Sequence, residues 1–503
     1  MAGTVYLVGA GPGDPGLLTL RGAELLSRAQ VVVYDYLASP ELLKLAPDDA
    51  EIIYAGKSGK NHTLSQDGIN TLLIEKAKAG NSVVRLKGGD PYIFGRGGEE
   101  AQELYKAGIS FEVVPGVSST AAAAAYAGVP LTHRDYSSQV VFITGHEREE
   151  REGSVHDWKA LKAIGTLVAV MGVKELPSIA ANLLKAGKDP NTPCVMIERG
   201  TTPRQRVAAA PLEKIAETAE SARISAPSLL VVGGVARLRD ELNWFERRPL
   251  TGLRILLTRT SEQAGTLSRS LRELGAEVIE RPIIKIEPAA QGGGALSDHI
   301  RRIKDYDYLV LTSPNGVKIF FAGLKEEKLD ARALSGVRIA VMGPGTGEAL
   351  ASYGLIPDIL PERFVSEGLL EAFKKEKPGK ALLARAAEAR EVLPRGLTDM
   401  GFSVEILTLY RTSPVPKTEA DEDLLIDPPH LSTITSASTA RGLSGLVPEG
   451  LRVKFPCASI GPVTTAEARR LGFPVALEAE VSTVSGLVEA ILKGAERIRS
   501  RRI

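Results

Sequence analysis

The chain has 503 residues, of which 44% are hydrophobic and 24% are charged, as is usual for globular domains. A chain of this length is too long for one core and predicts several compact units. Its formal net charge of +1 argues against a general nucleic-acid binder, because such proteins carry a marked basic excess.

The cysteines and histidines argue against structural cross-links. Cys194 and Cys457 are far apart, and the six histidines show no metal-ligand spacing, so we expect neither a disulfide framework nor a bound metal. Apolar runs such as 121–125 are far shorter than the ~20 residues that span a bilayer. No secretory signal opens the chain, so we expect a cytoplasmic protein without a membrane partner.

Short runs of Val, Ile and Leu alternate with helical patterns from the start of the chain. Strands are predicted at 5–8, 31–34, 82–86, 140–144 and 167–171, and helices at 18–29 and 67–79. This alternation is typical of parallel strands buried between crossover helices. The predicted fold class is therefore α/β.

A glycine-rich turn at 9–16 follows the first predicted strand and precedes a helix. Glycines at such a turn let a ligand approach the backbone amides at a helix N-terminus, although a tight turn alone explains them equally well. Asp14 stands where a dinucleotide-binding fingerprint has its third glycine, which disfavours hydride transfer.

Two further segments follow predicted strands. The segment 85–100 contains Gly88-Gly89-Asp90, in which the Asp90 carboxylate is placed to accept hydrogen bonds from a ligand hydroxyl or amine. An Asp-Pro turn is the alternative, but it does not explain the five glycines of this segment. In the segment 114–121, hydroxyls at a helix entry either cap the helix or contact a ligand.

Charge, proline and glycine cluster at 243–252, where we place the main domain boundary. The first domain is predicted at 1–248, with lobes at about 1–114 and 115–248. The second is predicted at 252–503. The stretches 282–290 and 413–417 resemble two crossings of a hinge, which predicts an inserted lobe at about 290–412 and another lobe built from 252–289 and 413–503.

The three loop segments, together with Tyr34-Asp35 and Pro130–Asp135, resemble the tetrapyrrole methylase family, specifically the uroporphyrinogen-III C-methyltransferases, over residues 3–246. The resemblance implies two α/β lobes with the sites in the cleft between them, and usually a homodimer. It also implies transfer of methyl groups from S-adenosylmethionine to C2 and C7 of uroporphyrinogen III, which gives precorrin-2.

The same resemblance assigns residues to this site. The cofactor site is implied to contain Pro12, Gly88, Gly89, Asp90, Ile93, Ser118, Ser119, Met171 and Gly200. Asp35 and Lys57 match the family's proton acceptor and donor, although a helix-capping aspartate and a solvated loop lysine are the plainer interpretations. Candidates to bind the substrate carboxylates, each of which can equally be a surface charge, are Arg85, Lys87, Arg96, His133 and Arg134.

The second half has no evident nucleophile or acid pair, and it resembles the uroporphyrinogen-III synthases over about 252–495. The pieces that carry this resemblance include 257–259, 311–317, 341–346 and 459–466. The resemblance implies closure of hydroxymethylbilane with inversion of the last pyrrole and loss of water. Tyr410 matches a tyrosine proposed to assist departure of the hydroxyl, and an aromatic packed on the hinge is the alternative. Candidates for carboxylate contacts, with helix capping as the alternative for each, are Thr258, Arg259, Ser313, Thr346, Ser436 and Thr464.

A fusion of these two activities is chemically coherent, because the product of the second domain is the substrate of the first. Three alternatives remain: a related methylase that acts later in corrin synthesis, a second half that binds or regulates without catalysis, and a dinucleotide oxidoreductase.

Overall fold

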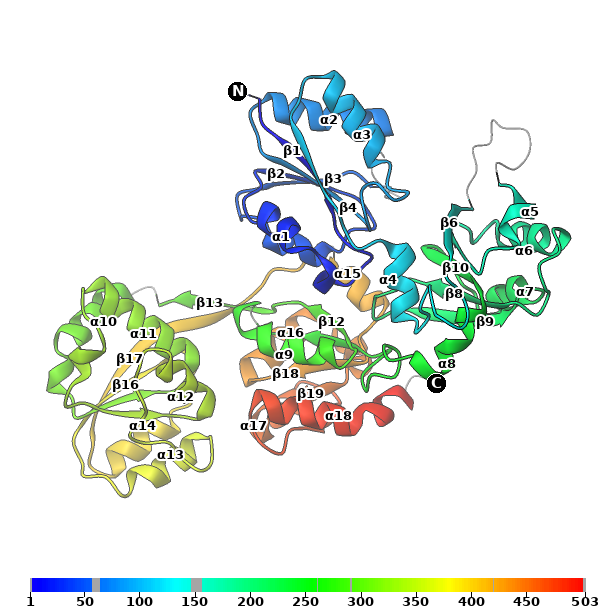
Figure 1. The fold of residues 1–503 in the computed structure, drawn as a ribbon. Helices are drawn as coiled ribbons and strands as arrows, with labels where there is room; N and C mark the ends of the chain where they lie inside the picture. The colour runs from blue at the N-terminus through cyan, green and yellow to red at the C-terminus, as the bar shows by residue number, and fades with distance from the viewer. Residues whose placement is uncertain are drawn as a thin grey trace. The chain divides into compact units, whose positions relative to one another are not determined.

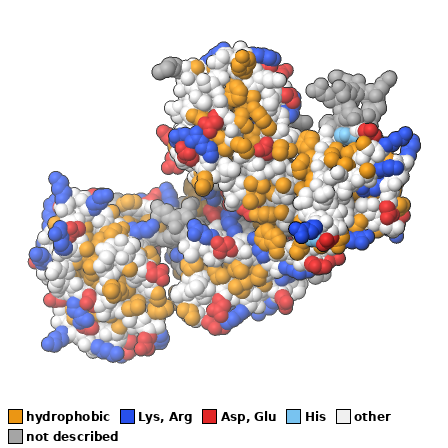
Figure 2. Space-filling model, in the orientation of Figure 1, with side chains coloured by type: hydrophobic (Ala, Val, Ile, Leu, Met, Phe, Trp, Pro, Cys, Tyr) orange, Lys and Arg blue, Asp and Glu red, His pale blue; other side chains and the backbone are white. Residues whose placement is uncertain are grey.

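The computed structural model describes residues 2–56, 64–145, 156–259, 261–289, 292–418 and 420–500, with only the backbone described at 261–264, 292–294 and 420. The chain divides into two units, Met1–Gly252 and Leu253–Ile503. Each unit contains two five-stranded sheets with helices packed on them (Figure 1), which confirms the α/β fold class. Charged side chains of both signs are interspersed over the visible faces of both units (Figure 2). Among the described residues, no helix is both long and apolar enough to cross a membrane.

The first lobe of the first unit is a parallel sheet with the strand order β3-β2-β4-β1-β5. Its strands are β1 (Val5–Gly9), β2 (Val31–Tyr34), β3 (Glu51–Tyr54), β4 (Val83–Lys87) and β5 (Phe111–Val114). Its helices are α1 (Leu20–Leu26), α2 (Gln66–Lys78) and α3 (Gly97–Lys106), with short 3-10 turns η1 (Pro15–Leu17) and η2 (Pro40–Leu45). Leu25 of α1 packs in the core on one face of the sheet, whereas Leu73 of α2 and Leu104 of α3 pack in the core on the other.

The second lobe has the strand order β6-β7-β10-β8-β9. Its strands are β6 (Val140–Thr144), β7 (Thr166–Val170), β8 (Pro193–Glu198), β9 (Arg206–Pro211) and β10 (Ser228–Gly233). Its helices are α4 (Ser119–Tyr126), α5 (Trp158–Leu161), α6 (Leu176–Lys185), α7 (Ile215–Ser221) and α8 (Arg239–Leu242), with η3 (Gly234–Leu238). Only β6 and β7 pair in parallel, whereas the other three pairs are antiparallel. The expectation of parallel strands fails here because β8 and β9 form a hairpin without a crossover helix.

One lobe of the second unit is an all-parallel sheet with the strand order β12-β11-β18-β19-β20. Its strands are β11 (Arg254–Leu257), β12 (Glu277–Glu280), β18 (Leu431–Ile434), β19 (Cys457–Ser459) and β20 (Val475–Glu478). Its helices are α9 (Ser261–Glu273), α15 (Ala420–Ile426), α16 (Ala437–Leu446), α17 (Pro462–Arg470) and α18 (Val484–Ser500), with η6 (Glu449–Lys454). The sheet is thus assembled from both ends of the unit.

The inserted lobe has the strand order β13-β17-β16-β14-β15. Its strands are β13 (Ile284–Pro288), β14 (Tyr308–Leu311), β15 (Arg338–Val341), β16 (Lys380–Ala386) and β17 (Ser403–Pro414). Its helices are α10 (Gly292–Arg301), α11 (Pro314–Glu326), α12 (Pro344–Ala351), α13 (Ser366–Phe373) and α14 (Val392–Asp399), with η4 (Ile303–Asp305) and η5 (Ala331–Leu334). β13 pairs antiparallel with β17 in this sheet, whereas the sequence analysis assigned residues up to 289 to the other lobe. The two strands pair because the chain enters and leaves the inserted lobe side by side.

Candidate functional site

The three loop segments of the first unit meet at the carboxyl ends of β1, β4 and β5. Gly11 and Gly89 exchange backbone hydrogen bonds, with N···O distances of 3.2 Å from Gly11 and 2.7 Å from Gly89. The Gly116 N–H donates to Asp90 Oδ2 at 2.9 Å. The structure therefore joins three segments that are far apart in the sequence into one cluster.

Two glycines in this cluster are required by close backbone contact. A Cβ atom on Gly9 would lie 2.4 Å from Gly116 Cα, so a larger residue would separate the loops. Gly89 has a φ of +71°, a conformation that residues with a side chain rarely adopt.

The cluster lies at a topological switch point of the parallel sheet. The neighbouring strands β1 and β4 continue into helices α1 and α3, which cover opposite faces of the sheet. In open α/β sheets, ligands bind outside the carboxyl ends of the strands at such a point. The fold therefore favours this edge of the sheet as a ligand site.

Asp90 shapes its own loop. Its Oδ1 accepts hydrogen bonds from the Tyr92 and Ile93 N–H groups at 2.8 and 3.1 Å, and Oδ2 accepts the bond from Gly116. The side chain is buried. Three backbone amides therefore take up most of the acceptor capacity of the Asp90 carboxylate, which holds the loop in place. Ile93 itself is exposed.

The remaining predicted cofactor residues lie in the loops around α4 and β7. Ser118 is the N-cap of α4, and its Oγ accepts from the Thr120 N–H at 3.3 Å. Ser119 is exposed as the first residue of that helix. Gly200 packs on α4, since a Cβ atom there would lie 2.3 Å from the Ala123 Cβ. Pro12 lies in the glycine-rich loop after β1 and is partly exposed. Met171 lies directly after β7 and is half-exposed.

Asp35 belongs to a network of charged side chains that extends into the first lobe. Arg85 donates to Asp35 Oδ2 at 3.2 Å and to Glu100 Oε1 at 3.3 Å, and Lys87 donates to the same Glu100 oxygen at 2.7 Å. Arg85, Lys87 and Glu100 are all buried. Burial, followed by the charge of Arg85, lowers the pKa of Lys87.

This network corrects two of the predicted substrate contacts. Arg85 and Lys87 are not available to substrate carboxylates, because all five residues of β4 are buried and both cations are paired internally. The sequence analysis missed Glu100, the shared partner. A buried strand that carries two cations requires a nearby anion, and that requirement is the signal that could have identified Glu100.

A pocket of about 590 Å³ lies beside Asp35. It is lined by Asp35, Tyr36, Leu37, Ala55, Gly56, Leu64, Ser65, Gln66, Ile69 and Arg96. Of the predicted substrate cations, Arg85 bonds to Asp35 from within the lobe, whereas the exposed Arg96 lines the pocket beside it. His133 and Arg134 lie in an exposed turn of the second lobe. Lys57 lies outside the described residues.

In the second unit, Tyr410 and Ser313 lie together in the inserted lobe. Their hydroxyl oxygens are 2.8 Å apart, and Ser313 Oγ also accepts from the Gly316 N–H as the N-cap of α11. Tyr410 is buried, and burial raises the pKa of its hydroxyl.

The other predicted contacts of the second unit follow the carboxyl ends of parallel strands, but several are used internally. The Thr258 hydroxyl is fully buried and donates to the Thr433 carbonyl at 2.6 Å, so the prediction that it binds substrate is wrong. Thr346 and Thr464 are buried within helices, and Ser436 caps α16. Arg259 differs from them, because its buried Nε has no hydrogen-bond partner among the residues that the structure describes, and burial lowers the pKa of the guanidinium.

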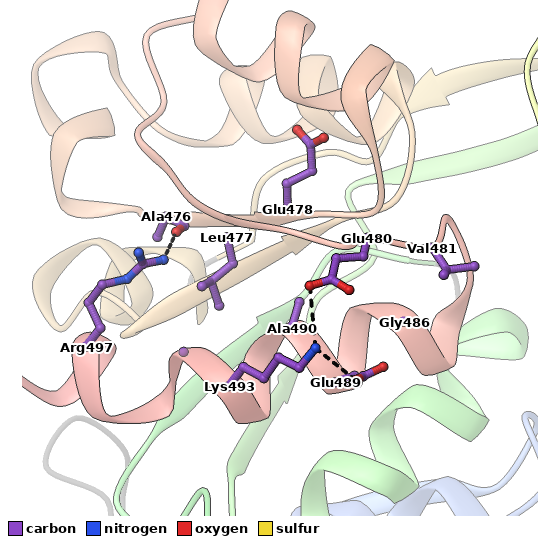
Figure 3. A pocket seen from close by; sticks show the side chains of 11 residues that line it. Ala476, Leu477, Glu478, Glu480, Val481, Gly486, Glu489, Ala490, Lys493 and Arg497 are labelled. Carbon is purple, nitrogen blue, oxygen red and sulfur yellow. Dashed lines mark hydrogen bonds and ion pairs between the residues drawn. The ribbon is translucent and has the colours of Figure 1, made fainter.

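A second pocket, of about 360 Å³, lies between β20 and α18 (Figure 3). Three of its charged side chains pair with one another: Lys493 lies 3.0 Å from Glu489 and 3.5 Å from Glu480. Arg497 donates to the Ala476 carbonyl. None of the predicted site residues lines this pocket.

Comparison with known proteins assigns the two units to two families. Residues 4–216 match the model of the tetrapyrrole (corrin/porphyrin) methylases, and residues 265–489 match that of uroporphyrinogen-III synthase HemD. The chain is 39% identical over 499 residues to the porphyrin biosynthesis protein HemD of Ruminiclostridium josui, a match that covers 98% of each chain.

Two further relatives are named as methyltransferases. The uroporphyrinogen-III C-methyltransferase of Bacillus subtilis is 41% identical over 334 residues, which is 66% of this chain and 68% of the relative. The S-adenosyl-L-methionine-dependent uroporphyrinogen III methyltransferase of Methanosarcina barkeri is 53% identical over 241 residues, which is 48% of this chain and 94% of the relative. The resemblances found in the sequence are confirmed: the chain belongs to the tetrapyrrole methylases in its first unit and to the uroporphyrinogen-III synthases in its second, and it is a bifunctional enzyme of tetrapyrrole biosynthesis.

Proposed function

We propose that the chain catalyses two consecutive reactions. The second unit closes hydroxymethylbilane to uroporphyrinogen III, with inversion of ring D and loss of water. The first unit then transfers two methyl groups from S-adenosylmethionine to C2 and C7, which gives precorrin-2. The observation that carries the proposal is the meeting of three loops at the switch point of a sheet that the methylase model matches.

The residues at this edge fit S-adenosylmethionine. The glycine turns after β1 and β4 let a ligand approach the backbone closely, and the N-terminus of α4 offers N–H donors to an anionic group such as a carboxylate. When bound, S-adenosylmethionine supplies a sulfonium methyl that an electron-rich pyrrole carbon attacks directly. We therefore assign the loop residues Pro12, Gly88, Gly89, Ser118 and Ser119 to its site, with Ile93, Met171 and Gly200 on adjoining loops.

Asp35 is our candidate for the base that accepts the proton released from the ring. Its Oδ1 accepts from the Leu37 N–H at 3.1 Å and Oδ2 accepts from Arg85, so the carboxylate is oriented before substrate arrives. Arg96 beside it suits a substrate carboxylate. We retain Lys57 as the proton donor and His133 and Arg134 as further carboxylate contacts.

In the second unit, the Tyr410 hydroxyl is our candidate to assist departure of the hydroxyl group of hydroxymethylbilane. Its raised pKa keeps it protonated, and the hydrogen bond with Ser313 orients it. The Arg259 Nε bonds to none of the described residues, and the guanidinium suits an anchoring role toward a substrate carboxylate. Loss of the hydroxyl leaves a stabilised cation on the substrate. The enzyme's main task is therefore to hold the linear tetrapyrrole in a folded conformation before ring closure.

We also propose a homodimer formed through the first unit and a location in the cytoplasm. Both follow from the family resemblance. Sedimentation velocity of the purified protein tests the first proposal, because a single species of monomer mass contradicts it.

Separate assays test the two activities. With uroporphyrinogen III and S-adenosylmethionine, the first unit is expected to give a product that carries two added methyl groups, and an unmodified substrate contradicts its assignment. With hydroxymethylbilane alone, the second unit is expected to give the type III isomer. The type I isomer, which forms spontaneously, contradicts the synthase assignment.

A further inference from the structure

The last segment of the first unit packs tightly on α4. Residues 239–248, which we call the strap, lie outside both family-model matches, since these end at 216 and begin at 265. Arg239 donates to the Ala127 carbonyl at 2.6 Å, and the indole N–H of Trp244 donates to the Ala125 carbonyl at 3.2 Å. The strap thus covers the C-terminal end of the helix whose N-terminus belongs to the proposed cofactor site.

Glu246 ties the strap to two loops through Gln205. Its carboxylate accepts from Arg239 at 2.7 Å and from the Gln205 side chain at 2.8 Å. The same Gln205 amide donates to the Tyr126 carbonyl at 3.3 Å, and its oxygen accepts from the Thr201 N–H at 2.9 Å. Thr201 and Gln205 are both buried, so these bonds are shielded from water.

Tyr126 connects the strap to the glycine-rich loop. Its ring packs against Phe245 and Trp244, with centroid distances of 4.7 and 5.0 Å. Its hydroxyl donates to Asp14 Oδ2 at 2.9 Å. The Arg248 guanidinium lies over the Phe245 ring, 3.9 Å from its centroid.

Asp14 sets the conformation of that loop. Its Oδ1 accepts from the Gly16 N–H at 2.8 Å, and its own N–H donates to Thr201 Oγ1 at 3.2 Å. The loop lies close to the second lobe as well, since a Cβ atom on Gly13 would be 2.6 Å from the Thr202 side chain. The placement of the loop therefore depends on contacts made by Tyr126 and Thr201.

We propose that Tyr126 is a positioning residue for the S-adenosylmethionine loop, and that the strap holds it against Asp14. The inference rests on the proposed methyl-transfer function. It makes the last segment of the first unit part of the support of the methyl-donor site, so a change in the strap alters cofactor affinity although the strap does not contact the cofactor.

Binding of S-adenosylhomocysteine to the full-length protein, measured by calorimetry, tests this role. Tyr126→Phe keeps the ring contacts and removes the bond to Asp14, so the Kd is expected to rise about tenfold. The melting temperature of the first unit is expected to fall by only about 2–4 °C for each kcal/mol lost with this bond, and the synthase activity of the second unit to stay unchanged, which a general loss of structure would not allow. Tyr105→Phe on the exposed face of α3 is the control and leaves the Kd unchanged.

A Kd for Tyr126→Phe within twofold of the wild type overturns the inference. Failure of the wild-type protein itself to bind S-adenosylhomocysteine contradicts the proposed function of the first unit, and so differs from failure of the inference alone.

A second variant tests the strap. Trp244→Leu removes the ring contact with Tyr126 and the hydrogen bond to the Ala125 carbonyl, which both lie in α4. It is expected to raise the Kd about threefold. Leu242→Ala, an exposed position in the same segment, is its control. If the strap acts through Tyr126, combining Trp244→Leu with Tyr126→Phe adds little to the effect of Tyr126→Phe. Fully additive effects would show that the strap does not act through Tyr126.

Discussion

The carboxylate of Asp35 is held from two sides at the edge of the pocket. The Leu37 N–H and the Arg85 guanidinium each bind one of its oxygens, and Glu100 in turn holds Arg85 from within the lobe. A base fixed in this way needs no rearrangement when the substrate arrives.

Asp35→Asn is expected to slow methyl transfer by about 10²- to 10⁴-fold, because the amide cannot accept the proton. Binding of S-adenosylhomocysteine is expected to persist, since Asp35 lies outside the three joined loops. Single-turnover methylation of uroporphyrinogen III gives the rate and calorimetry the binding. Asp49→Asn, an exposed position, is the control. A rate within tenfold of the wild type would remove Asp35 from the chemistry.

Tyr410→Phe is expected to slow cyclisation of hydroxymethylbilane by at least about tenfold through loss of the assisting hydroxyl. Loss of the bond to Ser313 is expected to cost about 1 kcal/mol of unfolding free energy. Chromatography of the type I and type III products measures the rate. Tyr353→Phe, a partly exposed position in the same lobe, is the control, and methyl transfer should be unaffected in both variants.

Because burial raises the pKa of Tyr410 above its ordinary value, the hydroxyl stays protonated as the pH rises from 7 to 9. The rate of cyclisation should therefore not fall over this range through loss of the Tyr410 proton. A decline in the wild type that is absent from Tyr410→Phe would contradict this.

An ion pair holds together the two segments that connect the lobes of the second unit. Arg281, just after β12, binds both carboxylate oxygens of Asp421 in α15, at 2.6 and 2.8 Å. It also donates to the Pro416 carbonyl on the returning crossing at 2.8 Å. The pair therefore joins the segments that enter and leave the inserted lobe.

Asp421→Asn is expected to lower the unfolding free energy of the second unit by about 2 kcal/mol at pH 7. Arg281 holds the pKa of Asp421 below its ordinary value, so this stabilisation is complete above about pH 4 and is lost as the pH falls through the folded-state pKa. The difference in unfolding free energy between the variant and the wild type should therefore narrow as the pH falls below about 4.

Urea unfolding followed by circular dichroism measures this effect. Both tryptophans, Trp158 and Trp244, lie in the first unit, so the fluorescence transition should be the same in variant and wild type. Asp423→Asn, exposed on the same helix, is the control. Equal stability of Asp421→Asn and the wild type would show that the Arg281–Asp421 ion pair contributes nothing to the unfolding free energy.

Sequence patterns predicted the elements better than their pairing. Strand-to-turn patterns located the three loops, because apolar runs that end in glycine mark the carboxyl ends of buried strands. Pairing depends on distant partners, so the hairpin of β8 and β9 and the placement of β13 were missed. Arg85 and Lys87 were misjudged for the same reason, since their position beside a motif does not reveal that Glu100 faces them inside the lobe.

The chain joins a member of the tetrapyrrole methylases to a member of the uroporphyrinogen-III synthases, and the reactions that we propose for them follow one another. The relative from Ruminiclostridium josui matches almost the full length of both units, so the combination is shared by more than one protein. In our proposal the two activities use different residues: Asp35 and the three loops in the first unit, and Tyr410 and Arg259 in the second. Substitutions should therefore be able to abolish either activity without loss of the other.

The most direct test supplies the full-length protein with freshly made hydroxymethylbilane and S-adenosylmethionine, and identifies the product by mass and absorbance. We expect a type III product with two added methyl groups from the wild type, and unmethylated uroporphyrinogen III from Asp35→Asn. A type I product from the wild type would contradict the synthase assignment, and an unmethylated type III product would contradict the methyltransferase assignment.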